Sequence, residues 1–251
     1  MGDLISVSLV IPTLNEARNL PHVLPLIPPL GELREVVLVD GQSTDETVQV
    51  ARELLPEIRV VVQRGKGKSD AVRRGVEEAT GDYVLIMDAD GSQDPQDISH
   101  YISGALDGFD LVKGSRYISG GGSDDESRLR RLLVWVTDTA ANILWGTRFT
   151  DIVYGMFLVR RQSFLDLGLD CNGFGLETQL MARASRRGFR ILEIPVVESP
   201  RRYGSSHLSV VRDGWHIGST VFVEFVHRLT HDALPPRRRL PPRQPDHPST
   251  S

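Results

Sequence analysis

The sequence is poor in the features that define several classes of protein. It has one cysteine, Cys171, so an internal disulfide is excluded and a reducing compartment is expected. No apolar run approaches the roughly 18 residues of a membrane-spanning helix, and no basic segment with an apolar run and a cleavage site opens the chain. We therefore expect a cytoplasmic protein, with at most a peripheral position on the cytoplasmic face of a membrane.

An excess of basic charge is also absent. The 29 Lys and Arg residues are outnumbered by 33 Asp and Glu, for a net charge of -4, which argues against a general nucleic-acid binder. What is present is the composition of a folded domain. With 251 residues, 40% of them hydrophobic and 25% charged, the chain is long enough for one large domain or two small ones with a buried core.

Short β-branched runs alternate with helical patterns along the first half of the chain. The expected strands are Ile5 to Ile11, Glu35 to Val39, Ile58 to Val62 and Tyr83 to Met87. The expected helices are Asn15 to Leu26, Thr44 to Leu55 and Ser69 to Ala79; capping boxes, Thr13-x-x-Glu16 and Ser43-x-x-Glu46, open the first two. This alternation predicts an α/β, Rossmann-like fold with a mostly parallel sheet and helices on both faces.

The second half is less regular. Asp110 to Gly114 and Met156 to Arg160 are expected strands, separated by a polar loop at 119–125. Two apolar stripes at helical spacing follow: Leu129, Leu132, Leu133, Val136, Ala140, Ile143 and Leu144, and then Val211, Trp215, Phe222, Phe225 and Leu229. We expect a main domain at 1–210, an amphipathic helix at 211–232 and a disordered Pro- and Arg-rich tail at 233–251.

Asp88 and Asp90 stand where the buried run Tyr83 to Met87 opens into a loop. In open α/β sheets, ligands bind outside the carboxyl ends of the strands. Two carboxylates at such an edge suit Mg²⁺ or Mn²⁺, especially when substrate phosphates complete the coordination. Asp also commonly ends strands and begins turns, so the pair gains its weight from the motifs around it.

Three strand-to-helix turns carry groups that suit a nucleotide. Ile11 to Glu16 and Asp40 to Thr47 precede expected helix N-termini, where phosphate, ribose or base can bind; helix capping is the structural alternative. The third turn, Arg64 to Asp70, contains Gly-Lys-Ser, but Val62 stands where a P-loop requires its first glycine. A P-loop is therefore rejected, and the turn is either a pyrophosphate contact or a plain basic turn.

In their order, these motifs resemble those of family-2 glycosyltransferases. Within that family, they resemble the mannosyltransferase group that acts on dolichol phosphate and other polyprenyl phosphates. The matching segments are residues 11–16, 39–47, 65–67 and 88–92, together with Gly114-Ser115-Arg116-Tyr117, and the resemblance extends over residues 5–229. It implies a GT-A fold, a nucleotide-diphosphate sugar donor such as GDP-mannose or UDP-glucose, and Mg²⁺ or Mn²⁺ as the cofactor.

The resemblance also assigns roles to single residues. The nucleotide-sugar pocket would be lined by Pro12, Thr13, Glu16, Asp40, Asp45, Lys66, Lys68 and Asp88. Asp88 and Asp90 would hold the metal, and Gln93 would complete its coordination shell. The family usually places this glutamine two residues after the second Asp, whereas Gln93 stands three residues after Asp90. Arg116 would contact phosphate. Arg201 and His207 lie in a segment that resembles a loop closing over the donor, with His207 where the family often has lysine.

Phe149-Thr150-Asp151 resembles the family segment that faces the acceptor, and the family implies an inverting in-line displacement. Asp151 would be the general base for a hydroxyl acceptor. A phosphate monoester, with a second pKa of about 6, is already largely anionic near pH 7, and Asp151 would then orient the metal or the acceptor. The metal held by Asp90, together with Arg116 and Arg201, would help to offset the charge on the leaving diphosphate. Glu177 is either an acceptor-side carboxylate or a helix-start carboxylate favoured by the dipole.

Arg128 and Arg131 precede an apolar stripe flanked by Trp135 and Trp145. Basic residues beside an aromatic and apolar face fit the capture of a polyprenyl phosphate at a membrane surface. The stripes are equally typical of core packing or of contact between two copies in a homo-oligomer. We expect transfer of mannose or glucose to a polyprenyl phosphate. The rival interpretations are the same chemistry on a soluble acceptor and a non-catalytic nucleotide-sugar-binding protein.

Overall fold

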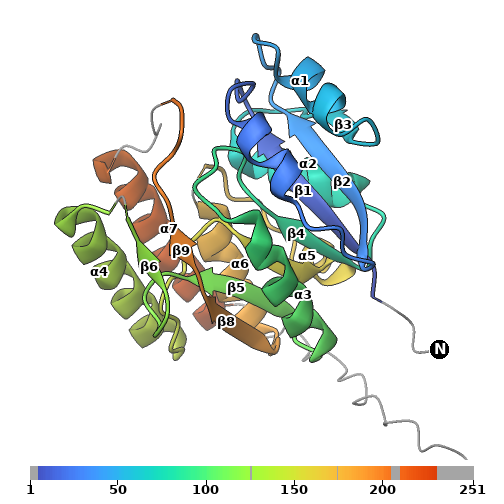
Figure 1. The fold of residues 1–251 in the computed structure, drawn as a ribbon. Helices are drawn as coiled ribbons and strands as arrows, with labels where there is room; N and C mark the ends of the chain where they lie inside the picture. Colours follow the sequence, from blue (N-terminus) through green and yellow to red (C-terminus); the bar gives the residue numbers. More distant parts are fainter. Residues whose placement is uncertain (1–4, 125, 174, 205–209, 231–251) are drawn as a thin grey trace, which may run out of the picture.

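A seven-stranded sheet forms the centre of the molecule (Figure 1). The computed structural model describes residues 5–124, 126–173, 175–204 and 210–230. In sheet order the strands are β3 (Arg59–Val62), β2 (Leu33–Asp40), β1 (Val7–Thr13), β4 (Tyr83–Ile86), β7 (Phe157–Arg160), β5 (Leu111–Ser115) and β8 (Ile191–Pro195). β7 runs antiparallel to both of its neighbours, and the other neighbouring strands are parallel. The predicted α/β class with a mostly parallel sheet is confirmed.

Helices cover both faces of this sheet. The helices are α1 (Thr47–Leu54) and α3 (Ile98–Leu106) on one face, and α2 (Lys68–Glu78), α5 (Arg161–Asp166) and α6 (Gly175–Arg186) on the other. Along β1 the side chains alternate between the two layers: Leu9 and Ile11 join the core under α1 and α3, and Val10 joins the core under α2. Burial on both faces explains why the strands are almost continuously apolar.

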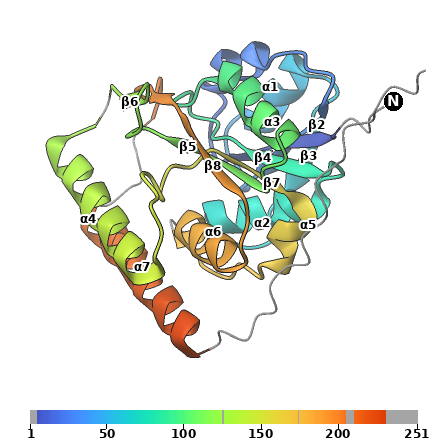
Figure 2. The same cartoon turned by 90° about the horizontal axis from the view of Figure 1, so that it is seen from below.

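Two long helices, α4 (Arg128–Trp145) and α7 (Val210–Thr230), lie side by side away from the sheet, next to α6 (Figure 2). Trp145 Nε1 donates to the carbonyl of Val221 at 3.3 Å, and Arg183 of α6 pairs with Glu224 of α7 at 2.9 Å. A two-stranded parallel ribbon, β6 (Gly122–Ser123) and β9 (Val197–Glu198), lies beside them.

The outward sides of α4 and α7 form a surface that we call the outer apolar face. Its members are Leu129, Leu132, Leu133, Val136, Ile143, Trp215, Phe222, Val223, Val226 and Leu229, each between 37% and 81% exposed. The predicted helical spacing of the stripe that begins at Leu129 is confirmed by α4. The interpretation that this stripe packs in the core is wrong for its five exposed members. Among the described residues, no helix is long and apolar enough to span a membrane.

The expected helix at Asn15 to Leu26 is wrong. The structure has two 3-10 turns there, Leu20–His22 and Leu24–Leu26, each with a proline in its first turn. Asn15 has a positive φ of 58°, a left-handed conformation that does not continue a helix. Each proline lacks a backbone N–H, which limits the segment to single turns.

Both predicted capping boxes are also wrong. No helix follows Thr13, whose Oγ1 donates to the carbonyl of Ile11 at 2.9 Å. α1 begins only at Thr47, so Ser43 lies in the preceding loop, where its Oγ accepts from the N–H of Asn15 at 2.9 Å. These polar residues join neighbouring loops to one another. The strands β6, β8 and β9 and the helices α3 and α5 were not predicted, and β6 lies within the expected loop at 119–125.

Candidate active site

The loops after β1 and β2 form one wall of a polar site at the carboxyl edge of the sheet. The N–H of Gly41 donates to the carbonyl of Thr13 at 2.8 Å, and the N–H of Thr44 donates to Asn15 Oδ1 at 2.8 Å. Asp40, at the end of β2, is buried and accepts from the N–H of Ser43 at 3.2 Å. Adjacent parallel strands therefore bring the predicted nucleotide-pocket residues Pro12, Thr13 and Asp40 together, as the order of the sheet requires.

Asp45 and Glu16 extend this wall with opposite electrostatic settings. Burial tends to raise the pKa of Asp45, but hydrogen bonds from Thr47 and from the N–H of Ala17 outweigh it and lower the pKa. For Glu16, burial raises the pKa, a hydrogen bond from Asn19 opposes the rise, and the negative charge of Asp90 adds to it. The carboxyl of Glu16 thus lies within electrostatic reach of the Asp88 and Asp90 pair.

Asp88 is held by protein groups on both carboxylate oxygens. Lys68 Nζ lies 2.6 Å from Asp88 Oδ1, and Gln93 Nε2 donates to Oδ2 at 3.1 Å. The side-chain oxygen of Gln93 accepts from the N–H of Asp88 at 2.8 Å. Lys68 also lies 3.6 Å from Glu177 Oε1. Burial tends to lower the pKa of Lys68, but the charges of Asp88 and Glu177 raise it above its ordinary value, so Lys68 is a fixed cation beside the pair.

Gly155 lets the backbone approach this cluster closely. A Cβ at this position would lie 2.6 Å from Lys68 Nζ and 2.8 Å from Asp88 Oδ2. The chain from Tyr154 to Gly155 therefore lies directly beside the loop after β4, against Asp88 and Lys68. Glu177 belongs to the same cluster and lies in the first turn of α6, so its helix-start placement is confirmed and its acceptor-side role stays a prediction.

Asp90 faces a cation from a distant part of the chain. Arg201 Nη2 lies 2.8 Å from Asp90 Oδ2, and the N–H of Ser92 donates to Oδ1 at 2.9 Å. The segment after Arg201 is fixed by Asn19, whose Oδ1 accepts from the N–H of Tyr203 at 3.1 Å. The predicted loop residue Arg201 thus lies at the Asp pair. His207 lies outside the described residues.

The donor atoms of the pair fit a divalent cation at Asp90. Its Oδ2 already faces a positive group, the guanidinium of Arg201, and carboxylate oxygens are ligands that Mg²⁺ and Mn²⁺ prefer. Among the described residues, no cluster of three or more His, Cys, Asp or Glu side chains could hold a metal by itself. Other ligands, such as substrate phosphates, would have to complete the shell. Asp88 and Gln93 are bound to each other, and their metal contacts stay predictions.

Arg116 and Asp151 form a buried, two-pronged ion pair. Arg116 Nε donates to Asp151 Oδ2 at 2.8 Å and Nη2 donates to Oδ1 at 3.0 Å, while Nη1 donates to Glu198 Oε2 at 2.8 Å. Asp151 is fully buried. Burial tends to lower the pKa of Arg116, but the charge of Asp151 outweighs it and raises the pKa, so the guanidinium stays charged. Bidentate geometry fixes both side chains in orientation.

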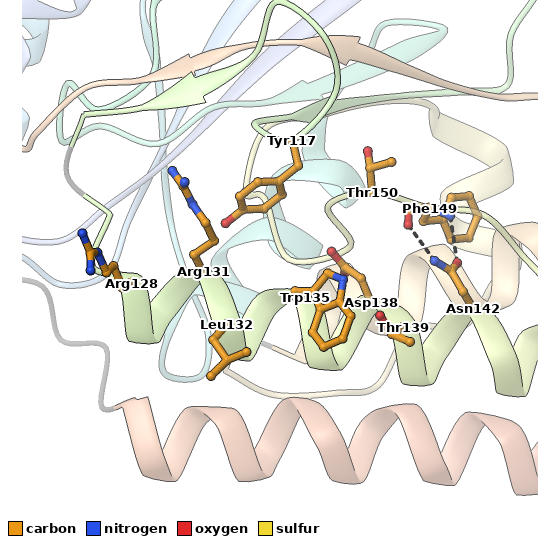
Figure 3. Close-up of a pocket in the computed structure, with 10 residues that line it drawn as sticks. All are labelled: Tyr117, Arg128, Arg131, Leu132, Trp135, Asp138, Thr139, Asn142, Phe149 and Thr150. Carbon is orange, nitrogen blue, oxygen red and sulfur yellow. Dashed lines mark hydrogen bonds between the residues drawn. The ribbon is translucent and has the colours of Figure 1, made fainter.

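A pocket of 620 Å³ opens between α4 and the segments around Tyr117 and Thr150 (Figure 3). Arg128 and Arg131 stand at one end, and Leu132 and Trp135 supply apolar wall. Arg131 Nε lies 2.9 Å from Glu126 Oε2, yet its side chain is 64% exposed. Both predicted acceptor-side arginines are therefore at this pocket, and Thr150 joins it to Asp151.

Asp138 of α4 is a buried carboxyl that lines the same pocket. Burial raises its pKa from 3.8 to about 7, opposed by a hydrogen bond from the N–H of Ile152 and reinforced by the charge of Asp151. Since the pKa in the folded state lies above that in the unfolded state, folding favours the neutral acid. This contribution to the free energy of unfolding is fully present below about pH 4 and is lost as the pH rises through about 7.

We therefore expect Asp138→Asn to be more stable than the wild type by as much as about 4 kcal/mol at pH 8, and by only about 1.5 kcal/mol at pH 5. The amide keeps the oxygen that accepts from Ile152 but cannot ionise. Urea denaturation at the two pH values measures the difference. If the free energy of unfolding changed with pH in the same way for the two proteins, the raised pKa of Asp138 would be contradicted.

Some functional residues were missed and one predicted residue lies apart. Lys66 is exposed, away from the contacts of Lys68. Glu198 accepts from Arg116, and Glu193 accepts from the N–H groups of Thr150 and Asp151. The fully buried Lys113, whose pKa burial lowers to about 8, donates to the carbonyl of Tyr154. A lysine inside an apolar strand was the available signal for Lys113; Glu193 and Glu198 gave none.

Comparison with known proteins identifies the class of this site. The family model "Glycosyl transferase family 2" matches residues 8–168. "Glycosyltransferase AglJ" of Haloferax volcanii is 33% identical over 225 residues, which cover 89% of this chain and 72% of that protein. "Dolichol-phosphate mannosyltransferase" of Pyrococcus furiosus is 31% identical over 236 residues, which cover 90% of this chain and 64% of that protein. The chain is a glycosyltransferase and belongs to family 2.

Solved structures agree on the fold. Glucosyl-3-phosphoglycerate synthase from Mycobacterium tuberculosis in complex with phosphoglyceric acid has a TM-score of 0.71 and 21% identity, and covers 88% of this chain and 80% of its own. The same enzyme with Mn²⁺, UDP and phosphoglyceric acid has a TM-score of 0.70 and 22% identity, and covers 88% and 78%. The expected GT-A fold is confirmed.

Proposed function

We propose that this enzyme transfers a hexose, mannose or glucose, from GDP-mannose or UDP-glucose to a polyprenyl phosphate at a membrane surface. The observation that carries the proposal is the pocket of 620 Å³ with an apolar wall and arginines at its end, beside the outer apolar face. A lipid phosphate requires this combination of apolar surface and fixed positive charge.

The donor would occupy the carboxyl edge of the sheet. Asp45 is exposed at the wall and would accept from a base or ribose, while the buried Asp40 holds the loop after β2 through the N–H of Ser43. Lys68 and Arg201 would supply positive charge for a diphosphate. Asp90 is the residue we assign to Mg²⁺ or Mn²⁺. The metal, when bound, would neutralise diphosphate oxygens and thereby favour their departure. The Mn²⁺ complexes of the structurally similar synthase support this assignment.

Donor binding would replace the pairing now made by Arg201. Its guanidinium lies 2.8 Å from Asp90 Oδ2 and neutralises this carboxylate. A cation at Asp90 would repel Arg201 and leave it available to the diphosphate, whose negative charge it would contact. The segment at 201–204, fixed to Asn19, would then cover the donor.

The reaction would be one in-line displacement with inversion. An acceptor phosphate oxygen forms the new bond to the anomeric carbon, while the bond from that carbon to the diphosphate oxygen breaks and its electron pair leaves with the nucleotide. The acceptor needs no strong base because a phosphate monoester is largely a dianion near pH 7. Asp151 supports this reaction as a positioning residue, since both its oxygens hold Arg116. Arg116 would contribute positive charge near the two phosphates.

The membrane part of the proposal is supported by the outer apolar face. Ten large apolar side chains share one side of two adjacent helices, and the basic residues Arg128 and Arg131 stand at the start of α4. Such a face can enter the boundary between headgroups and acyl chains while the cations meet anionic lipid. The pocket behind α4 would then receive the phosphate end of the acceptor.

A donor screen tests the function. The full chain is incubated with Mn²⁺, a short polyprenyl phosphate in anionic vesicles, and GDP-mannose or UDP-glucose; released nucleotide and lipid-linked sugar are measured. We expect lipid-linked product with one donor. Transfer to a small soluble alcohol or phosphorylated acid, at a rate indifferent to lipid, would favour the soluble-acceptor alternative.

Arg131→Gln tests the acceptor pocket. We expect the KM for polyprenyl phosphate to rise about tenfold and the KM for the donor to stay unchanged, because a lost charge-assisted phosphate contact is worth about 1.5 kcal/mol or more. Arg52→Gln, an equal charge loss on exposed α1, is the matched control and should change neither KM. A loss of donor affinity in Arg131→Gln, or no change at all, would contradict this placement of the acceptor.

A further inference from the structure

A second pocket, of 560 Å³, lies at the far end of α4 from Arg128. It is bordered by the turn after α4, by the last turns of α6 and α7, and by the segment that leads into β8. Three arginines line it, Arg148, Arg186 and Arg228, and Glu224 is the only carboxylate among its lining residues. The pocket shares no residue with the Asp88 and Asp90 site.

Two buried polar atoms at this pocket have no hydrogen-bond partner. They are Arg186 Nε and Glu224 Oε2, and Glu224 is only 1% exposed. The nearest approach between the two side chains is 3.7 Å, from Arg186 Nη1 to Glu224 Oε2, too long for a hydrogen bond. Buried donors and acceptors without partners carry a desolvation cost, which a polar ligand would remove.

The other arginines are placed to meet an anion. Arg228 Nη1 donates to the carbonyl of Leu144 at 3.1 Å, and this holds its guanidinium beside Gly146 at the end of α4. Arg148 has neither an ion pair nor a hydrogen bond to any described residue. Glu224 pairs with Arg183 at 2.9 Å through its other oxygen and lies 3.7 Å from Arg186, so this one carboxylate leaves the three arginines of the pocket with a net positive charge.

We propose that this pocket binds a phosphate ester that bears a free hydroxyl. Its phosphate oxygens accept from Arg148, Arg186 and Arg228, and its hydroxyl donates to Glu224 Oε2. A lone inorganic anion would satisfy the arginines but place negative charge beside that carboxylate. This site does not rest on the proposed transfer reaction, since none of its arginines has a role there.

Two sources can supply this chemistry. Ile143 and Leu229, neighbours in sequence of the pocket residues, belong to the outer apolar face and are 74% and 66% exposed. A glycerophosphate headgroup of a lipid bound at that face would reach the pocket from the bilayer. A free sugar phosphate or glycerol phosphate would reach it from water. The two sources differ in whether an intact vesicle is needed.

Calorimetry of the full chain with glycerol 3-phosphate and with inorganic phosphate tests the site. We expect saturable binding of glycerol 3-phosphate, tighter than that of phosphate. R186Q should weaken it about tenfold, and the exposed R148Q about threefold. R52Q is the matched control and should bind as the wild type does. R148Q guards against misfolding, because Arg148 has no partner among the described residues to lose.

Two further arms separate the alternatives. The first arm measures co-sedimentation with phosphatidylglycerol vesicles and, for comparison, with phosphatidylcholine vesicles. If binding to phosphatidylglycerol vesicles falls in R148Q and R186Q, the ligand is a lipid headgroup. If only soluble glycerol 3-phosphate binds, the ligand is the free ester. Binding that is lost in R131Q but kept in R186Q belongs to the acceptor pocket and overturns the proposal. Equal affinity for glycerol 3-phosphate in wild type, R148Q and R186Q, or no binding to either probe, overturns it as well.

Discussion

Asp90→Asn is expected to lower the rate of sugar transfer about 1,000-fold. The substitution keeps the size of the side chain and the oxygen that accepts from the N–H of Ser92, but it removes the negative charge. Without that charge, a divalent cation would lose the protein ligand that we assign to it at the diphosphate. The enzyme then has to expel the nucleotide with its developing charge offset only by Lys68, Arg116 and Arg201.

The same substitution should remove the effect of metal on donor binding. In the wild type, we expect Mn²⁺ to tighten the binding of the nucleotide sugar, as measured by calorimetry. In Asp90→Asn, affinity should be equal with and without Mn²⁺. The matched control is Asp94→Asn, at an exposed carboxylate of the same loop that accepts from the N–H of Gln96, and it should keep the metal effect. A wild type whose donor affinity ignores metal would refute the assignment.

The position of the site could be predicted because it depends on the order of strands and turns. Asp40 and Asp88 each follow a run of buried β-branched residues, and parallel neighbours bring such strand ends to one edge. Apolar runs are read directly from the sequence, and one side of the site is made of short loops close to them. Thr13, Glu16 and Asp40 therefore come together without any long-range information.

The pairing inside the site could not be predicted in the same way. Arg116 meets Asp151, 35 residues away, and Glu198, 82 residues away, and Arg201 reaches Asp90 from beyond β9. These contacts depend on the insertion of β7 into the sheet between β4 and β5. The local pattern of apolar and polar residues does not predict that insertion. From the sequence alone, a cationic residue beside a motif predicts a phosphate contact. The sequence does not show whether the fold brings a carboxylate next to that residue.

The helices were predicted less well than the strands, for reasons visible in single residues. Pro21 and Pro25 stop the segment after β1 from forming the expected helix. The apolar stripe from Leu129 to Ile143 had the spacing of a core helix, yet α4 buries Val134, Ala141 and Trp145 and leaves the stripe outside. Periodicity shows that a helix has two faces, but only the neighbours of that helix decide which face is buried.

Removing one member of the Arg116 and Asp151 pair should have the largest effect on stability. Asp151→Leu leaves the buried guanidinium of Arg116 with Glu198 as its one carboxylate partner in the described part of the chain, and we expect a loss of about 3–5 kcal/mol in the free energy of unfolding. Arg116→Met leaves a fully buried carboxylate and should cost a similar amount. Each single variant should also lose transfer activity, which by itself does not separate a folding defect from a catalytic one.

The double variant Arg116→Met with Asp151→Leu makes that separation. Replacing both members of a buried ion pair with apolar side chains of similar volume is often close to neutral, so we expect most of the lost stability to return in urea denaturation. Transfer activity should not return, because no positive charge replaces Arg116 near the phosphates. Glu198 keeps a partner in Arg130, at 3.4 Å, which limits the damage to the pair itself. A stable double variant with near-normal turnover would show that the pair serves the fold alone, and would remove both residues from the proposed mechanism.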